Sequence, residues 1–250
     1  MNTQYVINPT REKGEPVLDG TGLLVVNPSE ARLAVEHGLS HGGKRHFIFN
    51  SNLVQIPLTA DGGPFFIAGP SVGAPMAAMT LEKLMALGAQ TVVIFGWCGS
   101  LSPDLTIGDV LLPVWAESEE GTSKHYTEAD AKPEADSELR SSLKLWLLQK
   151  EIHVTEAPVW TTDAPYRETR HAVEAYAKKG VLAVDMEFSA LCAVAATRKV
   201  RIAAAFVVSD ELWGETWKSG FRTRKFKDQR KLLLASIMDF CANYETFFIR

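Results

Sequence analysis

The sequence predicts a single α/β domain, and three observations carry this prediction. Short apolar runs rich in β-branched residues alternate with amphipathic helical stretches along the chain. Two runs, residues 89–95 and 202–210, are apolar almost without interruption, as is typical of strands covered on both faces. The chain has 250 residues, enough for one large core, and shows neither an internal repeat nor a linker that would divide it.

The first half of the chain is expected to begin with an arm and then to alternate strands and helices. Residues 1–20 are polar and turn-rich, so we expect an arm ordered only by contact, with the domain at residues 21–250. Strands are expected at residues 23–26, 46–57, 65–68, 89–95 and 107–113. Helices are expected at residues 30–37, after a Pro28–Ser29 start, and at residues 76–87. Glycine-rich turns are expected at residues 38–44, 69–75 and 96–100.

The second half continues the alternation after a polar surface excursion at residues 117–135. Helices are expected at residues 137–150, 170–179 and 225–244, and a strand at residues 153–161. The loops at residues 162–169 and 211–221 separate these elements. Trp213 and Trp217 lie in the second loop, and we expect them to form a lid rather than part of the core.

Two carboxylates are expected where buried elements begin or end. Val184-Asp185-Met186-Glu187 opens an apolar helix, in which Asp185 can cap the N-terminus and the helix dipole favours the anion of Glu187. The strand at residues 202–210 ends in Ser209-Asp210. Because ligands in open α/β sheets bind beyond the carboxyl ends of strands, both carboxylates are candidates for a site. A helix cap and a turn aspartate are the simpler interpretations.

Composition excludes several classes of function. The formal net charge is −4, so we expect neither nucleic acid nor a membrane as partner. The three cysteines, Cys98, Cys192 and Cys241, have no paired spacing and are expected to be reduced thiols. We find no zinc-type spacing and no apolar segment of a signal peptide in residues 1–10, and therefore expect a cytoplasmic protein without a metal.

Seven short motifs then occur in order along the chain. They are Gly73-Ala74-Pro75 with Leu81-Glu82-Lys83-Leu84, Leu87-Gly88-Ala89, Gly96-x-Cys98-Gly99, Gly108-Asp109-Val110, Thr162-Asp163-Ala164-Pro165-Tyr166, Val184-Asp185-Met186-Glu187 and Val208-Ser209-Asp210. In these motifs, residues 23–212 resemble the nucleoside phosphorylase and nucleosidase family. That family includes uridine phosphorylase, hexameric purine nucleoside phosphorylase and methylthioadenosine/adenosylhomocysteine nucleosidase.

The resemblance implies a twisted mixed β-sheet flanked by helices, of the phosphorylase/hydrolase-like kind. It also implies a homo-oligomer, either a dimer or a hexamer, that cleaves the N-glycosidic bond of a nucleoside. No cofactor is implied, and inorganic phosphate is the one co-substrate to consider. By the same resemblance, Met186 packs against the ribose and Glu187 accepts hydrogen bonds from its 2′- and 3′-hydroxyls. An ionised carboxylate takes two such donors and stabilises an oxocarbenium-like transition state.

The base side of the site follows from the same resemblance. Asp210 matches the aspartate that protonates or hydrogen-bonds purine N7, and the Ser209-Asp210 ending therefore favours a purine. The loop that holds Tyr166 and Arg170 is expected near the base. Two arginines that follow the aspartate in sequence, Arg222 and Arg224, are further candidates on the base side.

The expected phosphate ligands are missing. Phosphorylases of this family carry Gly-Asp-Pro-x-Arg in the first turn, where this chain has Asn27-Pro28-Ser29-Glu30. They carry Arg-x-Gly-Ser/Thr after the central strand, where this chain has Gly96-Trp97. Arg45 alone matches a phosphate-site arginine of the family, the one that a neighbouring subunit contributes. A phosphate dianion in a pocket needs charge-assisted donors, and one arginine facing Glu30 supplies few.

Three hypotheses remain open at this point. The first is a hydrolase with Glu30 as the general base, and the missing phosphate ligands favour water slightly over phosphate. The second is a phosphorylase of the purine or uridine type that holds phosphate with other groups, and the third is a non-catalytic binder of nucleosides or nucleotides. Trp97 is expected either to fill the phosphate region, to shape it for a different ligand or to pack in the core.

Overall fold

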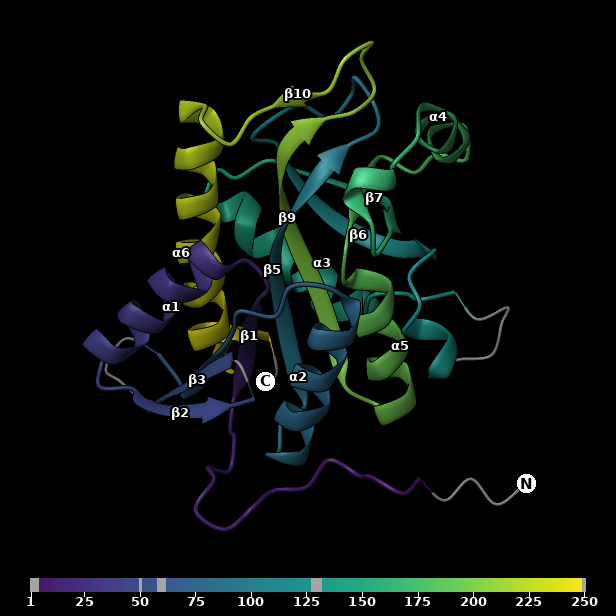
Figure 1. Cartoon of the computed structure of the whole chain (residues 1–250). Coiled ribbons are helices and arrows are strands. Elements are labelled where there is room, and N and C mark those ends of the chain that lie inside the picture. The colour runs from purple at the N-terminus through teal and green to yellow at the C-terminus, as the bar shows by residue number, and fades with distance from the viewer. Residues whose placement is uncertain (1–4, 50, 58–61, 127–131, 249–250) are drawn as a thin grey trace.

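A computed structural model describes residues 5–49, 51–57, 62–126 and 132–248, and within them ten strands form one mixed sheet (Figure 1). The strand order is β10-β9-β6-β7-β8-β5-β1-β4-β3-β2. β5 also pairs with β9, so that β5, β9, β6, β7 and β8 close into a ring. The bounds are β1 Thr21–Val25, β2 Lys44–Ile48, β3 Ser51–Ile56, β4 Phe65–Gly69, β5 Thr91–Ser100, β6 Val110–Ser118, β7 Val154–Thr161, β8 Ala183–Asp185, β9 Arg201–Glu211 and β10 Lys218–Ser219.

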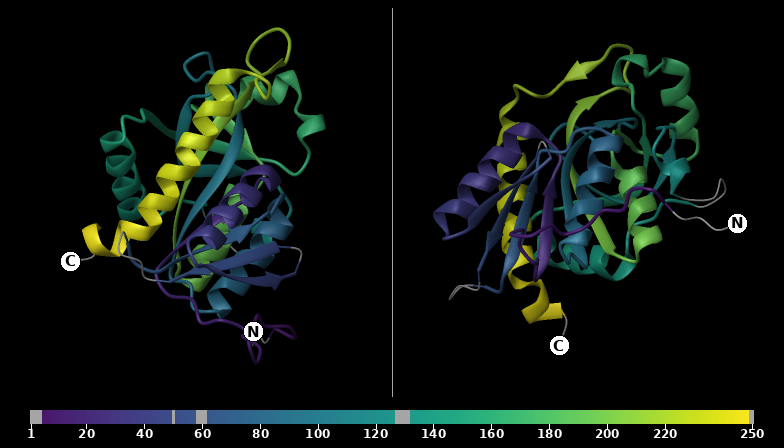
Figure 2. Two further views of the ribbon diagram at one scale, coloured as in Figure 1. Left: turned by 90° about the vertical axis from the view of Figure 1, so that its left-hand side faces the viewer. Right: turned by 60° about the horizontal axis from the view of Figure 1, so that its bottom comes forward.

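Helices cover both faces of this sheet, as the two views of Figure 2 show. The strands alternate between the faces: Leu23 and Val25 pack in a core with α1, α3 and α6, whereas Leu24 packs in a core with α2 and α5. The helices are α1 Pro28–Ser40, α2 Ala74–Ala86, α3 Ser137–Gln149, α4 Arg170–Lys178, α5 Phe188–Arg198 and α6 Arg224–Phe248, with short 3₁₀ helices at η1 Ser123–His125 and η2 Pro165–Arg167. The architecture confirms the predicted single α/β domain with a mixed sheet flanked by helices.

Three expected elements take a different form in the structure. The strand expected at residues 46–57 is a hairpin of β2 and β3, and Phe49, in the turn that follows β2, adopts φ 50. The turn expected at residues 96–100 is instead the last part of β5, which continues to Ser100 through its pairing with β8 and β9. Tertiary pairing overrides the local turn preference of the two glycines here. The helix expected to begin at Asp185 begins at Phe188, because residues 183–185 form β8.

The described part of the expected N-terminal arm lies against the domain. The Leu18 side chain is buried, and its N–H donates to Leu87 O over 2.8 Å. Lys83 Nζ donates to Glu15 Oε2 over 2.6 Å and to Thr10 O over 2.8 Å. Residues 1–4 of the arm and residues 127–131 of the expected surface excursion lie outside the described residues.

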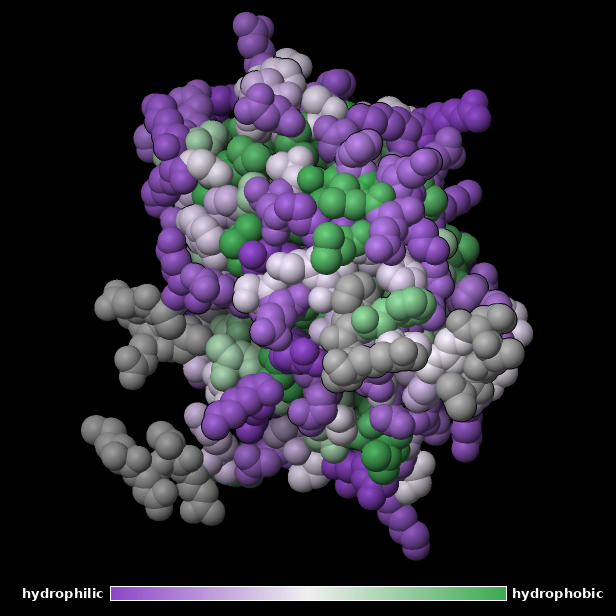
Figure 3. All heavy atoms as spheres, turned by 180° about the vertical axis from the view of Figure 1, so that it is seen from behind, coloured by the Kyte–Doolittle hydropathy of each residue, from purple (hydrophilic) through white to green (hydrophobic). Residues whose placement is uncertain are grey.

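The surface mixes polar and apolar side chains on the face opposite to that of Figure 1 (Figure 3). Among the helices of the described chain, none combines the length and the apolar character needed to span a membrane. The three cysteines are free thiols, and all are buried.

Candidate active site

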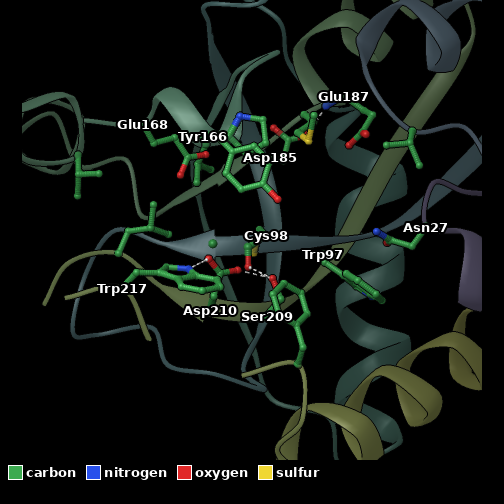
Figure 4. A pocket seen from close by; sticks show the side chains of 18 of the residues that line it. Asn27, Trp97, Cys98, Tyr166, Glu168, Asp185, Glu187, Ser209, Asp210 and Trp217 are labelled. Carbon is green, nitrogen blue, oxygen red and sulfur yellow. Dashed lines mark hydrogen bonds between the residues drawn. The ribbon is translucent and has the colours of Figure 1, made fainter. Parts of the chain in front are cut away.

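A pocket of about 550 Å³ opens beside the ends of β5, β8 and β9 (Figure 4). Eight of the predicted site residues line it: Asn27, Trp97, Tyr166, Arg170, Met186, Glu187, Ser209 and Asp210. The pocket thus brings together segments of the chain that are up to about 180 residues apart, through parallel pairing of β1, β5 and β9.

The carboxylate of Asp185 holds the turn from β8 into α5. Its Oδ2 accepts the N–H groups of Glu187 over 2.9 Å and of Phe188 over 2.6 Å, and its Oδ1 accepts the Thr161 hydroxyl over 2.6 Å. These bonds satisfy N–H groups at the start of α5 that have no partner within the helix. The N-cap residue of α5 is Glu187 rather than the expected Asp185, but the Asp185 side chain accepts the N–H groups at the start of the helix and so holds the backbone of the turn at Met186 and Glu187.

Glu187 is almost fully buried at this turn, with 6% of its surface exposed. Its Oε1 accepts the Gly73 N–H over 2.6 Å, and Gly73 has φ 85 at the start of α2, a conformation that favours glycine. Burial, and then the charge of Asp185, raise the pKa of Glu187. The pocket therefore holds a carboxyl group that ionises readily only when a ligand supplies donors or positive charge.

Asp210 lies on β9 at a β-bulge. Cys98 pairs with Val208 and Gly99 pairs with Asp210, so Ser209 is the extra residue. Asp210 Oδ1 accepts the Ser209 hydroxyl over 2.6 Å, and its Oδ2 accepts the Trp217 indole N–H over 2.7 Å. Burial raises the pKa of Asp210, whereas these two hydrogen bonds lower it. The bulge thus turns into the pocket a carboxyl group whose pKa lies above that of an ordinary aspartate.

Arg170 and Trp217 both line the pocket, and Arg170 holds the loop on which Trp217 lies. Arg170 Nη1 donates to Leu212 O over 2.6 Å and Nη2 to Glu215 O over 3.1 Å, which fastens the loop that carries Trp217. Arg170 was expected to bind the base, but its guanidinium is engaged with this loop. Trp217 lines the pocket as a lid residue would, whereas Trp213 is absent from the lining.

Glu168 is a pocket residue that the motifs did not indicate. It lies between Tyr166 and Arg170 in sequence, and it lines the same pocket as Asp210, beside Tyr166 (Figure 4). Burial, and then the charge of Asp210, raise its pKa to about 7. An ionisable residue in the expected base-side loop was the only sequence signal that pointed to it.

The opposite end of the pocket holds Asn27 and Trp97. Trp97 packs against Phe221 and Phe226, with ring centroids 5.8 Å and 5.3 Å away. Its indole N–H and the side-chain oxygen of Asn27 are both buried and have no hydrogen-bond partner in the part of the chain that the structure describes. Such groups are costly in an empty site, and a polar ligand would satisfy them. Trp97 thus both packs and lines the pocket.

Glu30 does not reach the pocket, contrary to the hypothesis that it is the general base. It is fully buried on α1, where Arg230 Nη1 of α6 donates to Glu30 Oε1 over 2.6 Å and Ser29 Oγ donates to Oε2 over 2.7 Å. The sequence correctly placed Glu30 in the first turn of a helix, α1. Its partner lies 200 residues later in the chain, so the sequence pattern could not show that the carboxylate is occupied.

The remaining four predicted residues also lie outside the lining. Arg45 is exposed on β2, at the far edge of the sheet. Gly96 is buried one residue before Trp97, where a Cβ would come within 3.0 Å of Val26 and Phe206. Arg222 is exposed, and Arg224 pairs with Asp228 over 3.2 Å. Among the described residues, the Asp210 carboxylate accepts from Ser209 and Trp217 and forms no ion pair with either arginine. Across the described ranges, no cluster of three or more His, Cys, Asp or Glu residues is arranged to hold a metal ion.

The Glu30–Arg230 pair is predicted to be structural. We expect Arg230→Gln to cost about 3 kcal/mol of unfolding free energy, because it leaves a buried carboxylate unpaired. The double variant Glu30→Gln with Arg230→Gln should recover most of that loss, as measured by urea denaturation. The single variant Glu30→Gln completes the comparison. If the losses caused by Arg230→Gln and by Glu30→Gln simply add in the double variant, Glu30 and Arg230 are not coupled as the structure has them.

Glu187→Gln is predicted to make stability less dependent on pH. The pKa of Glu187 is raised in the folded protein, so the folded state binds more protons than the unfolded state above the ordinary value of 4.5. Its contribution to stability is therefore full below that value and is lost as pH rises through the folded pKa. Thermal unfolding should show the variant gaining on wild type between about pH 5 and about pH 8.5. Parallel curves for the two proteins would contradict the raised pKa.

Comparison with known proteins places the chain in a family. The model of the phosphorylase superfamily matches residues 21–238. The chain is 32% identical over 154 residues to a guanosine phosphorylase of Halorubrum lacusprofundi, covering 61% of this chain and 63% of that protein, a little under two thirds of its length. It is 29% identical over 171 residues to a DeoD-type purine nucleoside phosphorylase of Brevibacillus brevis, covering 67% of this chain and 73% of that protein.

Two solved structures share the fold. Purine nucleoside phosphorylase from Toxoplasma gondii, in complex with immucillin-H, superposes with a TM-score of 0.81 at 18% identity and covers 93% of this chain and 94% of its own. A Plasmodium knowlesi homologue of the P. falciparum enzyme gives 0.77 at 20% identity, covering 97% of each chain. The family-model match across the domain confirms the resemblance in the motifs: the chain belongs to the phosphorylase superfamily, a family of enzymes.

Proposed function

We propose that this protein cleaves the N-glycosidic bond of a purine nucleoside by phosphorolysis. The observation that carries the proposal is that one pocket presents Glu187 at the β8–α5 turn and Asp210 at the end of β9 (Figure 4). The first suits the sugar and the second suits the leaving base. Relatives named guanosine phosphorylase and purine nucleoside phosphorylase support the same reaction.

On the sugar side, Glu187 is the acceptor for ribose hydroxyls and Met186 supplies apolar contact. One oxygen of Glu187 already accepts the Gly73 N–H, and the other has capacity for ligand donors. Two donors from the ribose favour the ionised carboxylate. The positive charge that develops on the sugar favours it further, so the interaction strengthens in the transition state.

On the base side, Asp210 serves as the acid that donates a proton or hydrogen bond to N7. Its raised pKa means that it retains a proton more readily than an ordinary aspartate. The Ser209 hydroxyl and the Trp217 indole N–H orient its two oxygens. An N7 that receives this hydrogen bond makes the purine a better leaving group.

At the end of the pocket opposite Asp210, the Trp97 indole N–H would donate to the nucleophile and the side-chain oxygen of Asn27 would accept from a hydroxyl of the nucleophile; neither group has a partner among the described residues. The slight preference for water, with Glu30 as base, finds no support: Glu30 is paired with Arg230, and the named relatives are phosphorylases. Phosphate is thus the proposed co-substrate, and the reaction needs no further cofactor. A homo-oligomer belongs to the proposal, because Arg45 on edge strand β2 would reach a pocket only in another copy.

The phosphate dependence of base release tests the proposal. We expect purine release from guanosine, inosine or adenosine to need inorganic phosphate and to yield ribose 1-phosphate, detected by ³¹P NMR. Equal release without phosphate, together with free ribose, would identify a hydrolase. Binding of purine nucleosides without any base release would identify a non-catalytic binder.

Asp210→Asn is predicted to slow purine release by about a hundredfold, because the variant has no acid to protonate the base. A riboside with an activated leaving group, such as nitrophenol, needs no such proton and should lose far less. The ratio of the two losses, measured as kcat/KM, is the readout. A similar loss on both substrates would argue against an acid role for Asp210.

A further inference from the structure

Unpaired polar atoms gather around the Asn27 and Trp97 end of the pocket (Figure 4). Within the described ranges, the buried side-chain atoms without a hydrogen-bond partner are Thr21 Oγ1, Asn27 Oδ1, His46 Nε2, Trp97 Nε1 and Arg230 Nε. Asn27 and Trp97 line the pocket, and Arg230 Cζ lies 5.8 Å from the centroid of the Trp97 ring. Because buried polar groups are nearly always paired, three unpaired ones in one place indicate a place built for a polar ligand.

Arg230 connects this end of the pocket to helices α1 and α6. It lies on α6, and its Nη1 donates over 2.6 Å to Oε1 of Glu30 in the first turn of α1. Its Cζ also lies 5.6 Å from the centroid of the Phe226 ring, so aromatic rings and the Glu30 carboxylate hold the guanidinium. Arg230 is absent from the lining of the pocket. It can therefore act on a ligand there through its charge and through Trp97.

The charges in the lining are the second observation. The acidic residues that line the pocket are Glu168, Asp185, Glu187 and Asp210, and the one basic residue among the lining residues is Arg170. The guanidinium of Arg170 already donates to two carbonyl groups of the 212–215 loop. An anion that enters the pocket thus meets several carboxyl groups, whereas Arg230 places a positive charge beside Trp97.

We propose that Arg230 is a positioning residue whose positive charge holds the phosphate nucleophile at the Asn27 and Trp97 end. The inference rests on the proposed function, and it assigns to α6 a charge that the motifs of the sequence do not supply. Phosphate has oxygens that accept from the Trp97 N–H and, when protonated, a hydroxyl that donates to Asn27 Oδ1. Glu30 moderates the charge of Arg230 because the two are paired. A charge in a partly buried place acts over several ångströms with little screening.

The test measures the dissociation constant and the KM of inorganic phosphate in variants that remove one charge at a time. Arg230→Gln leaves the Glu30 carboxylate unbalanced, so phosphate is repelled and should bind about tenfold more weakly. Glu30→Gln leaves the guanidinium unbalanced, so phosphate should bind at least about threefold more tightly. The KM of the nucleoside should change little in either variant. A merely structural pair predicts instead that both variants weaken phosphate binding, because both disturb the same contact.

Three further variants separate charge from folding. Arg230→Gln added to Glu30→Gln leaves no buried carboxylate unpaired, and it should bind phosphate about tenfold more weakly than Glu30→Gln alone. This comparison decides the matter if the single variant Arg230→Gln does not fold. Arg230→Lys keeps the charge and should retain most of the affinity for phosphate. Lys231→Gln removes an exposed cation from the next position of α6 and is the matched control, with phosphate binding unchanged.

Isothermal titration with inorganic phosphate needs no turnover and therefore separates this inference from the proposed function. If the variants shift phosphate binding in opposite directions but no nucleoside is cleaved, the proposed reaction fails and the role of Arg230 stands. If cleavage depends on phosphate but Glu30→Gln and Arg230→Gln weaken its binding alike, the inference about Arg230 is overturned. It is also overturned if Arg230→Gln behaves like Lys231→Gln, or if wild type binds no phosphate.

Discussion

The buried carboxylate of Asp185 is the contact on which the site depends. It ties β7, through the Thr161 hydroxyl, to the first N–H groups of α5, and so sets the direction in which Glu187 enters the pocket. Burial raises the pKa of Asp185, while its hydrogen bonds lower it. A carboxylate with three donors is a sound helix cap in a low-dielectric interior. Its nearness also opposes ionisation of Glu187, so structural support and functional tuning come from the same group.

The pocket presents two carboxyl groups that are held by different parts of the fold. Glu187 lies where two helices and β8 meet, whereas Asp210 lies on a β-bulge whose extra residue is Ser209. Both carboxyl groups have raised pKa values because they are buried. A site of this kind is unfavourable when empty and gains most when a ligand brings hydroxyls, N–H groups or developing positive charge. Under the proposed function, the cost of burying these groups is part of what would make the pocket selective for a nucleoside.

Much of the fold and half of the site could be predicted from the sequence, and the remainder depends on contacts distant in the chain. The apolar strands and the Val184–Glu187 and Ser209–Asp210 motifs are local patterns. Both motifs line the pocket, although residues 183–185 form β8 and not the expected start of the helix. Gly96–Ser100 has the composition of a turn, but pairing with β8 and β9 keeps it in β5. Glu30 is occupied by Arg230, and Arg170 by the backbone of the 212–215 loop, partners that no local pattern contains. Glu168 lies in a loop without a period, so only its three-dimensional position makes it a candidate.

The orientation of a bound nucleoside tests the central claim most directly. An inosine analogue with a carbon–carbon bond in place of the glycosidic bond cannot be cleaved, so a crystal structure of its complex would show the ground state. The account predicts the ribose 2′- and 3′-hydroxyls within hydrogen-bonding distance of the Glu187 carboxylate and N7 at Asp210. A ribose at the Asp210 end, or a ligand bound outside this pocket, would contradict it.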